Sequence, residues 1–220
     1  MIVGLTGGIA TGKSTFSAQL RAQGLPVIDA DVLAREVVAP GTDGLAEIVD
    51  TFGAVYLTPN GELDRVRMGA AVFADESMRE KLNAIIHPRV RAGMWAKARE
   101  ITAGDARQIA ILDVPLLMEG GTHTLVDVTV LVYASTAIQY ERLIARNDLT
   151  YEQARARIEA QWPIDQKRDL ADIVVDNAGG MDEVPRLAQA LGEHLKALAQ
   201  RGATAEGTFD KSVVERMTIR

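Results

Sequence analysis

The sequence predicts an α/β fold in which a five-stranded parallel sheet is flanked by helices. Short apolar runs rich in Val, Ile and Leu recur along the chain, as is typical of strands buried on both faces. Helical patterns lie between these runs, and alternating strands and helices form parallel sheets through right-handed crossovers. The predicted strands are residues 2–5, 27–28, 109–112, 128–132 and 173–175.

The composition limits the classes of function. Of the 220 residues, 47% are hydrophobic and 25% charged, which is ordinary for a globular protein. The net charge of −6 argues against nucleic acid as the main partner, because phosphate backbones select basic surfaces. No apolar run approaches the roughly 18 residues that span a bilayer. There is no cysteine, which suits a reducing compartment. We therefore expect a cytoplasmic protein with no membrane partner, either a monomer or a small homo-oligomer.

A glycine-rich loop follows the first predicted strand. Residues 7–14 fit the pattern G-x-x-x-x-G-K-[ST], and a helix is expected to begin at about Lys13. Backbone N–H groups in such a loop converge on phosphate oxygens, Lys13 would reach the β- and γ-phosphates, and Ser14 would help to hold Mg²⁺. An ordinary glycine turn is the alternative. A dinucleotide-binding loop fits poorly, because the glycines do not match G-x-G-x-x-G. The pattern therefore predicts a nucleoside triphosphate and Mg²⁺ as ligands.

The second predicted strand ends in two aspartates. Asp29 and Asp31 share a face while the chain stays extended, and Arg35 lies one helical turn beyond Asp31. Doubly wound sheets bind their ligands at the carboxyl ends of their strands. Asp31 could accept a proton from a substrate hydroxyl or help to hold Mg²⁺. Alternatively, Asp31 is only the N-cap of the next helix.

The stretch 42–107 is long for a connection between two strands. It carries several helical patterns, so we interpret it as an inserted substrate-binding lobe. His87 precedes Pro88 within it, and a proline in the first turn of a helix is favourable, so this pair could mark only a helix entry. No metal-ligand spacing links the three histidines of the chain.

The third predicted strand ends in Asp113, which resembles the second metal-binding motif of phosphate-loop enzymes. The apolar loop that follows contains Pro115, Leu116 and Leu117 and ends in Glu119. This loop could line a ligand pocket. Alternatively, the leucines are core residues and Glu119 is a solvated loop charge.

Helical patterns also fill residues 135–171, where Arg142 and Arg146 are four residues apart and share one helix face. An anion between the two guanidinium groups would relieve their repulsion, although a solvated helix surface is the plain alternative. The last predicted strand is followed by a loop that contains Asn177. Residues 202–220 have weak periodicity, and we expect this C-terminal tail to fray.

Taken in order, these segments resemble the dephospho-CoA kinase family. The resemblance covers about residues 1–198. It rests on TGGIATGKST (6–15), IDAD (28–31) with AR (34–35), IHP (86–88), PLLME (115–119) and DNAG (176–179), with supporting similarity at GELDR (61–65) and VF (72–73).

The family transfers the γ-phosphate of ATP to the ribose 3′-hydroxyl of dephospho-CoA, which is the last step of CoA synthesis. The resemblance implies one phosphate-loop kinase domain (1–201), with the inserted lobe at about 42–107 and a lid at about 135–171. It makes Asp31 the general base, and Lys13 and Arg142 the groups that stabilise the moving phosphoryl group. It places Mg²⁺ at Ser14.

The remaining implied roles concern binding. Arg146 would belong to the lid, and Asn177 would lie near the adenine. The ATP phosphates would be cradled by Gly8, Ile9, Ala10, Thr11, Gly12, Lys13, Ser14 and Thr15. Dephospho-CoA would be bound by Asp31, Arg35, His87, Pro115, Leu116, Leu117 and Glu119.

Two positions depart from the family pattern. The family often has an apolar residue where this chain has Asp113, which puts a metal-binding role for Asp113 in doubt, and often has a larger apolar residue than Met118. One alternative function is a kinase for another small molecule, such as a nucleoside, a nucleotide or a sugar acid. Another is a nucleotide-dependent switch, which usually carries a guanine-reading motif such as Asn-Lys-x-Asp. The sequence lacks that motif.

Overall fold

The computed structural model describes residues 1–180 and 182–220, in two compact units. The first, which we call the core unit, contains Met1–Ile28 and Ala98–Arg220. The second, the inserted unit, contains Asp29–Lys97. The inserted lobe is expected from the sequence at about 42–107, so the compact unit both begins and ends earlier than expected. None of the helices described is long and apolar enough to cross a membrane.

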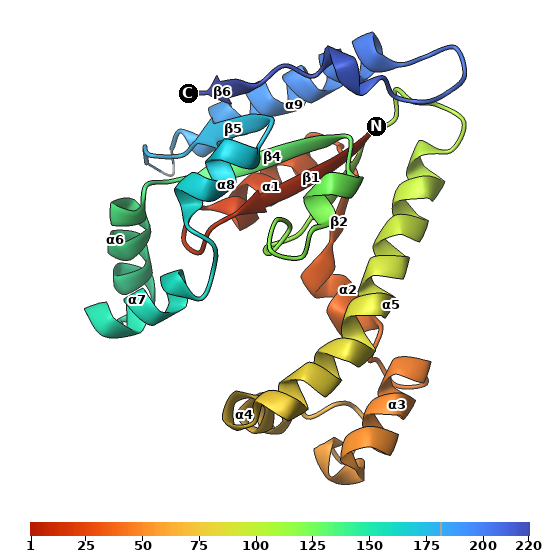
Figure 1. Ribbon diagram of the computed structural model, residues 1–220, viewed down its shortest axis with the longest axis vertical. Coiled ribbons are helices and arrows are strands. Elements are labelled where there is room, and N and C mark those ends of the chain that lie inside the picture. Colours follow the sequence, from red (N-terminus) through yellow and green to blue (C-terminus); the bar gives the residue numbers. More distant parts are fainter. Residues whose placement is uncertain (181) are drawn as a thin grey trace. The chain divides into compact units, whose positions relative to one another are not determined.

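The core unit is built on a twisted sheet with the strand order β2-β3-β1-β4-β5-β6 (Figure 1). β1 pairs in parallel with β3 and β4, and β5 pairs in parallel with β4 and β6. The predicted α/β fold with a parallel sheet is confirmed. The strands are β1 (Ile2–Gly7), β2 (Val27–Asp29), β3 (Ala110–Asp113), β4 (Val128–Tyr133), β5 (Ile173–Asp176) and β6 (Met217–Ile219).

The prediction of five strands is wrong, because the C-terminal tail supplies a sixth. In β6, Met217 pairs with Ile173 and Ile219 pairs with Val175. The side chain of Ile219 packs into the core and is 8% exposed. Arg216 also donates a hydrogen bond to the carbonyl oxygen of Asp169. A three-residue strand is too short for its alternation to stand out in a sequence, so its contacts with β5 decide its structure.

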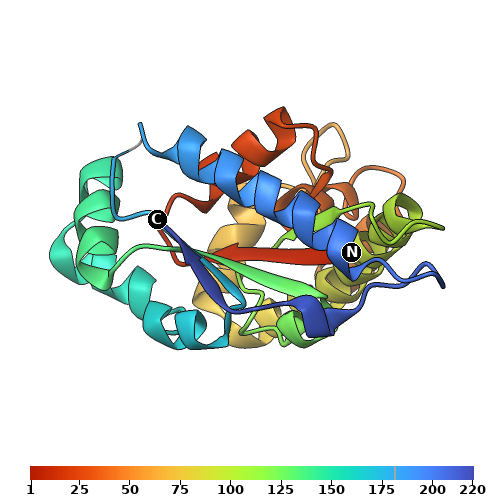
Figure 2. The same cartoon turned by 90° about the horizontal axis from the view of Figure 1, so that it is seen from above.

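Helices cover both faces of the sheet. Figure 2 shows α1 (Lys13–Ala22) and α9 (Val184–Gly202) side by side on one face, where they share a cluster of buried residues with alternate positions of the strands. α8 (Ile164–Leu170) covers part of the other face, where Ile164 packs with Met118 and Leu131. The first cluster includes Val3, Leu5, Phe16, Leu20, Val130, Val132, Ile173, Val175, Leu187, Leu191 and Leu195.

The predicted lid segment forms α6 (Thr136–Asn147) and α7 (Tyr151–Glu159), and α8 then returns the chain to the sheet. A capping box begins α7, because the Thr150 hydroxyl accepts a hydrogen bond from the Gln153 backbone N–H and the Gln153 side chain accepts one from the Thr150 backbone N–H. The rings of Tyr140 and Tyr151 stack with their centroids 4.8 Å apart, which joins α6 to α7. The core unit also contains the short 3-10 helices η2 (Thr122–Leu125) and η3 (Lys211–Val213).

The inserted unit is helical. It contains α2 (Ala30–Glu36), α3 (Asp43–Phe52), the 3-10 helix η1 (Ala54–Tyr56), α4 (Arg65–Ala74) and most of α5 (Glu76–Thr102). Its small core consists of Val38, Leu45, Ile48, Leu63, Met68 and Ile85. Pro88 lies inside α5, so the interpretation of His87-Pro88 as a helix entry is wrong.

We predict that Ile219→Ala destabilises the core unit. Truncating a largely buried isoleucine at a sheet edge should cost about 2 kcal/mol, which for a chain of this length lowers Tm by roughly 4–8 °C. Calorimetry measures this change. Thr218→Ala is the matched control, because Thr218 is the exposed residue of the same strand and its loss should leave Tm nearly unchanged. Equal stability of both variants would show that β6 does not pack on β5 in solution.

Candidate active site

The glycine-rich loop adopts a tight conformation between β1 and α1. Ala10 and Gly12 both have left-handed backbones, with φ of 61° and 91°. The backbone N–H and the side-chain hydroxyl of Thr11 both donate to the carbonyl oxygen of Gly8, at 3.2 and 2.9 Å. α1 then begins at Lys13, so the positive end of its dipole lies at the loop. The loop therefore has the form that binds phosphate.

Two glutamines fix the peptide groups of Ile9. Gln161 accepts a hydrogen bond from the Ile9 backbone N–H at 2.8 Å, and Gln139 donates one to the Ile9 carbonyl oxygen at 2.7 Å. A Cβ atom at Gly8 would lie 2.3 Å from Gln139 Nε2, so this close approach requires glycine. The sequence gives no sign of either contact, because neither glutamine belongs to a motif and both are more than a hundred residues from the loop.

Asn177 also forms a hydrogen bond to the phosphate loop. Its side-chain amide donates to the carbonyl oxygen of Thr11 at 2.8 Å, and the residue is 1% exposed. A Cβ atom at Gly12 would lie 2.5 Å from Asn177 Nδ2. The structure therefore brings together the phosphate loop and the loop after β5, which are far apart in the sequence.

The two lid arginines lie in different surroundings. Arg142 is partly buried and donates a hydrogen bond of 2.6 Å to the carbonyl oxygen of Gly179, in the same loop as Asn177. Arg146 is exposed, and its guanidinium donates to the side chain of Asn147 at 2.9 Å. Arg142 therefore contacts the loop that contains Asn177, whereas the hydrogen bond of Arg146 lies within the lid.

Lys13 forms an ion pair with Asp113. The Lys13 ammonium lies 2.5 Å from Asp113 Oδ1, and the Asp113 side chain is 3% exposed. The pairing follows from the fold, because β1 and β3 are neighbours and Leu5 lies in register with Asp113. Asp113, which the sequence left open, is therefore a member of the site. Its carboxylate and the hydroxyl of the exposed Ser14 are oxygen donors of the kind that Mg²⁺ prefers.

The loop after β3 presents its two leucines differently. Leu116 is 47% exposed, whereas Leu117 is fully buried and packs against Gly4. Leu117 is therefore a core residue, as one of the two interpretations of this loop expects, and Leu116 is the leucine that a ligand can reach. Thr6 anchors the loop by donating from its hydroxyl to the Pro115 carbonyl oxygen at 3.0 Å.

Glu119 is not a solvated loop charge. Its side chain is 16% exposed and its carboxylate forms an ion pair of 2.6 Å with the fully buried Lys167 of α8. The same carboxylate accepts a hydrogen bond of 3.1 Å from the backbone N–H of Trp162.

The predicted acceptor residues Asp31, Arg35 and His87 all belong to the inserted unit, and all three are exposed. Asp29 caps α2, because its carboxylate accepts hydrogen bonds from the backbone N–H groups of Asp31 and Val32, at 2.9 and 3.2 Å. The alternative that Asp31 is the N-cap is therefore wrong. Asp31 lies in the first turn of α2, where its side chain remains available to a ligand.

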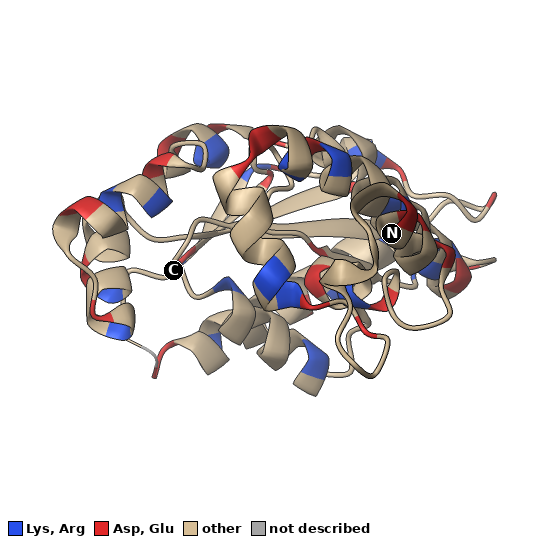
Figure 3. Ribbon diagram, turned by 90° about the horizontal axis from the view of Figure 1, so that it is seen from below, with Lys and Arg blue, Asp and Glu red and all other residues tan. Residues whose placement is uncertain are grey.

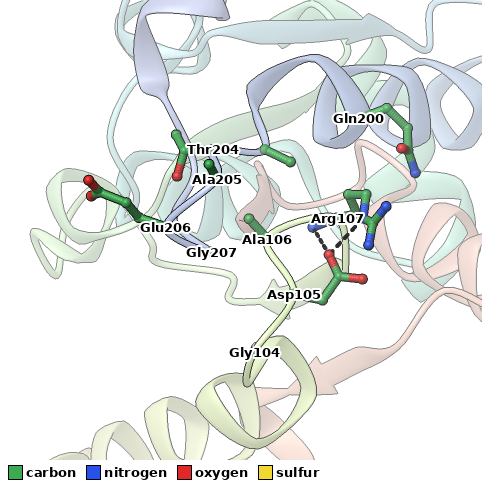
Figure 4. A pocket seen from close by; sticks show the side chains of 10 residues that line it. Gly104, Asp105, Ala106, Arg107, Gln200, Thr204, Ala205, Glu206 and Gly207 are labelled. Carbon is green, nitrogen blue, oxygen red and sulfur yellow. Dashed lines mark hydrogen bonds and ion pairs between the residues drawn. The ribbon is translucent and has the colours of Figure 1, made fainter.

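A polar hollow of about 670 Å³ lies elsewhere in the core unit (Figure 4). It is lined by the turn before β3 (104–107) and by the end of α9 with the start of the tail (200–207). In this hollow Arg107 is paired with Asp105 at 2.9 Å. The hollow precedes β3, whereas the phosphate loop follows β1, and the two strands are parallel. It therefore lies at the opposite edge of the sheet from the phosphate loop.

Charges do not form a basic stripe on the described part of the chain. Figure 3 shows Lys and Arg interspersed with Asp and Glu along the ribbon, as the net charge of −6 suggests.

Near the end of β4, burial and a hydrogen bond of 3.0 Å to Asp165 raise the pKa of Tyr133, so its hydroxyl stays a donor at neutral pH.

Comparison with known proteins places this geometry in a family. A family model described as dephospho-CoA kinase matches residues 1–183. A dephospho-CoA kinase of Geobacillus kaustophilus is 48% identical over 198 residues, which cover 90% of this chain and 98% of that protein. The chain belongs to the dephospho-CoA kinase family. An Anaeromyxobacter dehalogenans dephospho-CoA kinase is 52% identical over 190 residues, covering 86% of this chain and 90% of that one.

Solved structures agree with the family match. A Thermus thermophilus protein of known crystal structure superposes with a TM-score of 0.70 at 32% identity, covering 89% of this chain and 97% of that one. A Campylobacter jejuni dephospho-CoA kinase has a TM-score of 0.71 at 23% identity, with the same coverage, and supports the fold. This chain is therefore an ATP-dependent kinase that phosphorylates the ribose 3′-hydroxyl of dephospho-CoA, giving CoA and ADP. The alternatives of a different small-molecule kinase and a nucleotide switch are set aside.

We predict that Asn177→Asp weakens ATP binding by about tenfold and destabilises the protein by about 1–3 kcal/mol, because a carboxylate of the same shape cannot donate to the Thr11 carbonyl oxygen. Calorimetric titration with ATP and thermal unfolding measure the two effects. Asn147→Asp is the control, because Asn147 is exposed and lies outside this contact. An unchanged affinity in Asn177→Asp would mean that the bond to Thr11 does not shape the loop.

Proposed function

We propose that the phosphate loop and the residues bound to it hold ATP, and that Asp31 activates the acceptor hydroxyl. The observation that carries this proposal is the set of contacts around the loop. Lys13 is paired with Asp113, and Asn177 is bonded to the Thr11 carbonyl oxygen. These contacts link three strand ends of one sheet edge, which is where doubly wound folds bind their ligands.

On the donor side, the backbone of residues 8–15 surrounds the ATP phosphates, and Lys13 turns from Asp113 to the β- and γ-phosphates when ATP binds. Asn177 and the loop around it lie near the adenine. Arg142 exchanges the Gly179 carbonyl oxygen for the transferring phosphoryl group, where a planar guanidinium suits the equatorial oxygens. The lid, with Arg146, closes over the nucleotide and excludes water.

On the acceptor side, dephospho-CoA is held by Arg35, His87 and the loop 115–119. Asp31 accepts the proton of the ribose 3′-hydroxyl as its oxygen attacks the γ-phosphorus. The proposal requires the inserted unit to bring Asp31 to the γ-phosphate in the ternary complex. Asp29 caps α2, so the Asp31 carboxylate is not needed as a cap. Its exposed position in the first turn of α2 suits this role.

Ser14 and Asp113 are the residues that we propose for Mg²⁺. Kinases of this type bind the ion by one or two protein oxygens together with the nucleotide, so a cage of three acidic or histidine side chains is not required, and none occurs among the described residues. When bound, the ion neutralises charge on the β- and γ-phosphates. A cytoplasmic location is part of the same proposal, since a chain without cysteine needs no oxidising compartment.

We predict that Asp31→Asn lowers kcat by about 100-fold or more and leaves the Kd of ATP within about twofold, because only proton acceptance is lost. Steady-state kinetics and ATP titration separate the two effects. Asp50→Asn, an exposed aspartate in α3 of the same unit, is the control and should behave as the wild type. Wild-type kcat in Asp31→Asn would exclude Asp31 as the base.

We predict that Arg142→Ala lowers kcat more than it raises the Kd of ATP, because its guanidinium acts on charge that develops during transfer. An effect of about 100-fold on kcat with less than about fivefold on Kd would support the assignment. If both quantities change equally, Arg142 serves ground-state binding instead.

A further inference from the structure

Lys167 is a fully buried lysine in a position that the reaction does not explain. Its side chain is 0% exposed, and its ammonium lies 2.6 Å from Glu119 Oε1. Neither Lys167 Nζ nor Glu119 Oε2 has a further hydrogen-bond partner within the described residues. An ammonium removed from water is costly unless it is paired, so Lys167 depends on Glu119 for its place in the fold.

Glu119 also contacts the turn between α7 and α8. Its Oε1 accepts a hydrogen bond from the Trp162 backbone N–H at 3.1 Å. The preceding residue, Gln161, accepts one from the Ile9 backbone N–H at 2.8 Å. A chain of contacts thus runs from Lys167 through Glu119 and the turn 160–163 to the phosphate loop. All of its members belong to the core unit.

We propose that Lys167 is a positioning residue of the kinase. It fixes the carboxylate of Glu119, which sets the loop 115–119 and the turn 160–163 against the phosphate loop. This inference rests on the proposed function in one respect, the assignment of the loop 115–119 to dephospho-CoA. Because its side chain is fully buried, Lys167 acts through Glu119 and not by touching a substrate.

The ion pair fixes the orientation of the Glu119 carboxylate. A buried pair of apolar side chains could fill the same volume, and such replacements are often neutral or stabilising. An apolar side chain at 119 would not accept the Trp162 N–H, however, and the turn would lose its link to the loop. The charge on Lys167 therefore orients the one carboxylate that joins these two segments.

Kinetics of three variants test this proposal: Lys167→Met, Glu119→Gln and the double variant. We expect Lys167→Met to raise the KM values of dephospho-CoA and ATP by about fivefold, because both the acceptor loop and the phosphate loop lose their support. If Lys167 acts through Glu119, the double variant should be no worse than the poorer single variant. Unchanged KM values in folded Lys167→Met would overturn the proposal, and so would a double variant that is clearly worse than either single variant.

The double variant also guards against misfolding, because it removes both buried charges together. Lys211→Met is the control for the loss of a paired lysine that has no link to the phosphate loop, although the Lys211 side chain is 53% exposed. Lys211 forms another ion pair of the core unit, 3.8 Å from Asp127, and its ammonium donates to the Val126 carbonyl oxygen. Its loss should lower Tm without changing either KM. If Lys167→Met behaves in the same way, its role is only structural and the proposal fails.

Tryptophan fluorescence follows the turn directly. The chain has two tryptophans, so Trp95→Phe leaves Trp162 as the only one. In that background, Lys167→Met should make Trp162, now 38% exposed, more accessible to acrylamide. Equal quenching would contradict the proposal. Leu116→Ala tests the proposed function separately: an unchanged KM for dephospho-CoA would remove the loop 115–119 from the acceptor site, while the quenching result would still decide the role of Lys167.

Discussion

The conformation of the phosphate loop depends on hydrogen bonds from side chains that are distant in the sequence. Two of its residues have left-handed backbones, and one of them is Ala10, for which that region is unfavourable. The surrounding structure offsets this strain through hydrogen bonds to the peptides of Ile9 and Thr11. The donors and acceptors are side chains of Gln139, Gln161 and Asn177, so three distant segments of the chain determine the shape of one loop.

The charges of the site follow from the same arrangement. The Lys13 ammonium is paired with Asp113 at the end of the neighbouring strand, and the Lys13 side chain is only 14% exposed. Lys167 and Glu119 repeat the pattern, because their ion pair connects α8 to the loop 115–119. In both cases the partner charge orients a side chain and prevents an isolated buried charge.

The parallel sheet, the phosphate loop and the order of the site segments could be predicted from the sequence, because each depends on local patterns of apolar residues and glycines. β6 could not be, since its three residues become a strand only by pairing with β5. Sequence also could not separate Leu116 from Leu117, or show that Asp29 and not Asp31 caps α2. The roles of Gln139, Gln161 and Lys167 depend on contacts across the fold, and no local pattern marks them.

In our proposal, this phosphate loop holds the ATP from which the phosphoryl group passes to dephospho-CoA. The most direct measurement is ADP release by the purified protein with ATP and Mg²⁺, in the presence and absence of dephospho-CoA, with the nucleotide products identified. The account predicts that ADP release requires dephospho-CoA and that CoA appears in equal amount. Folded protein that binds ATP but releases no additional ADP with dephospho-CoA would contradict it.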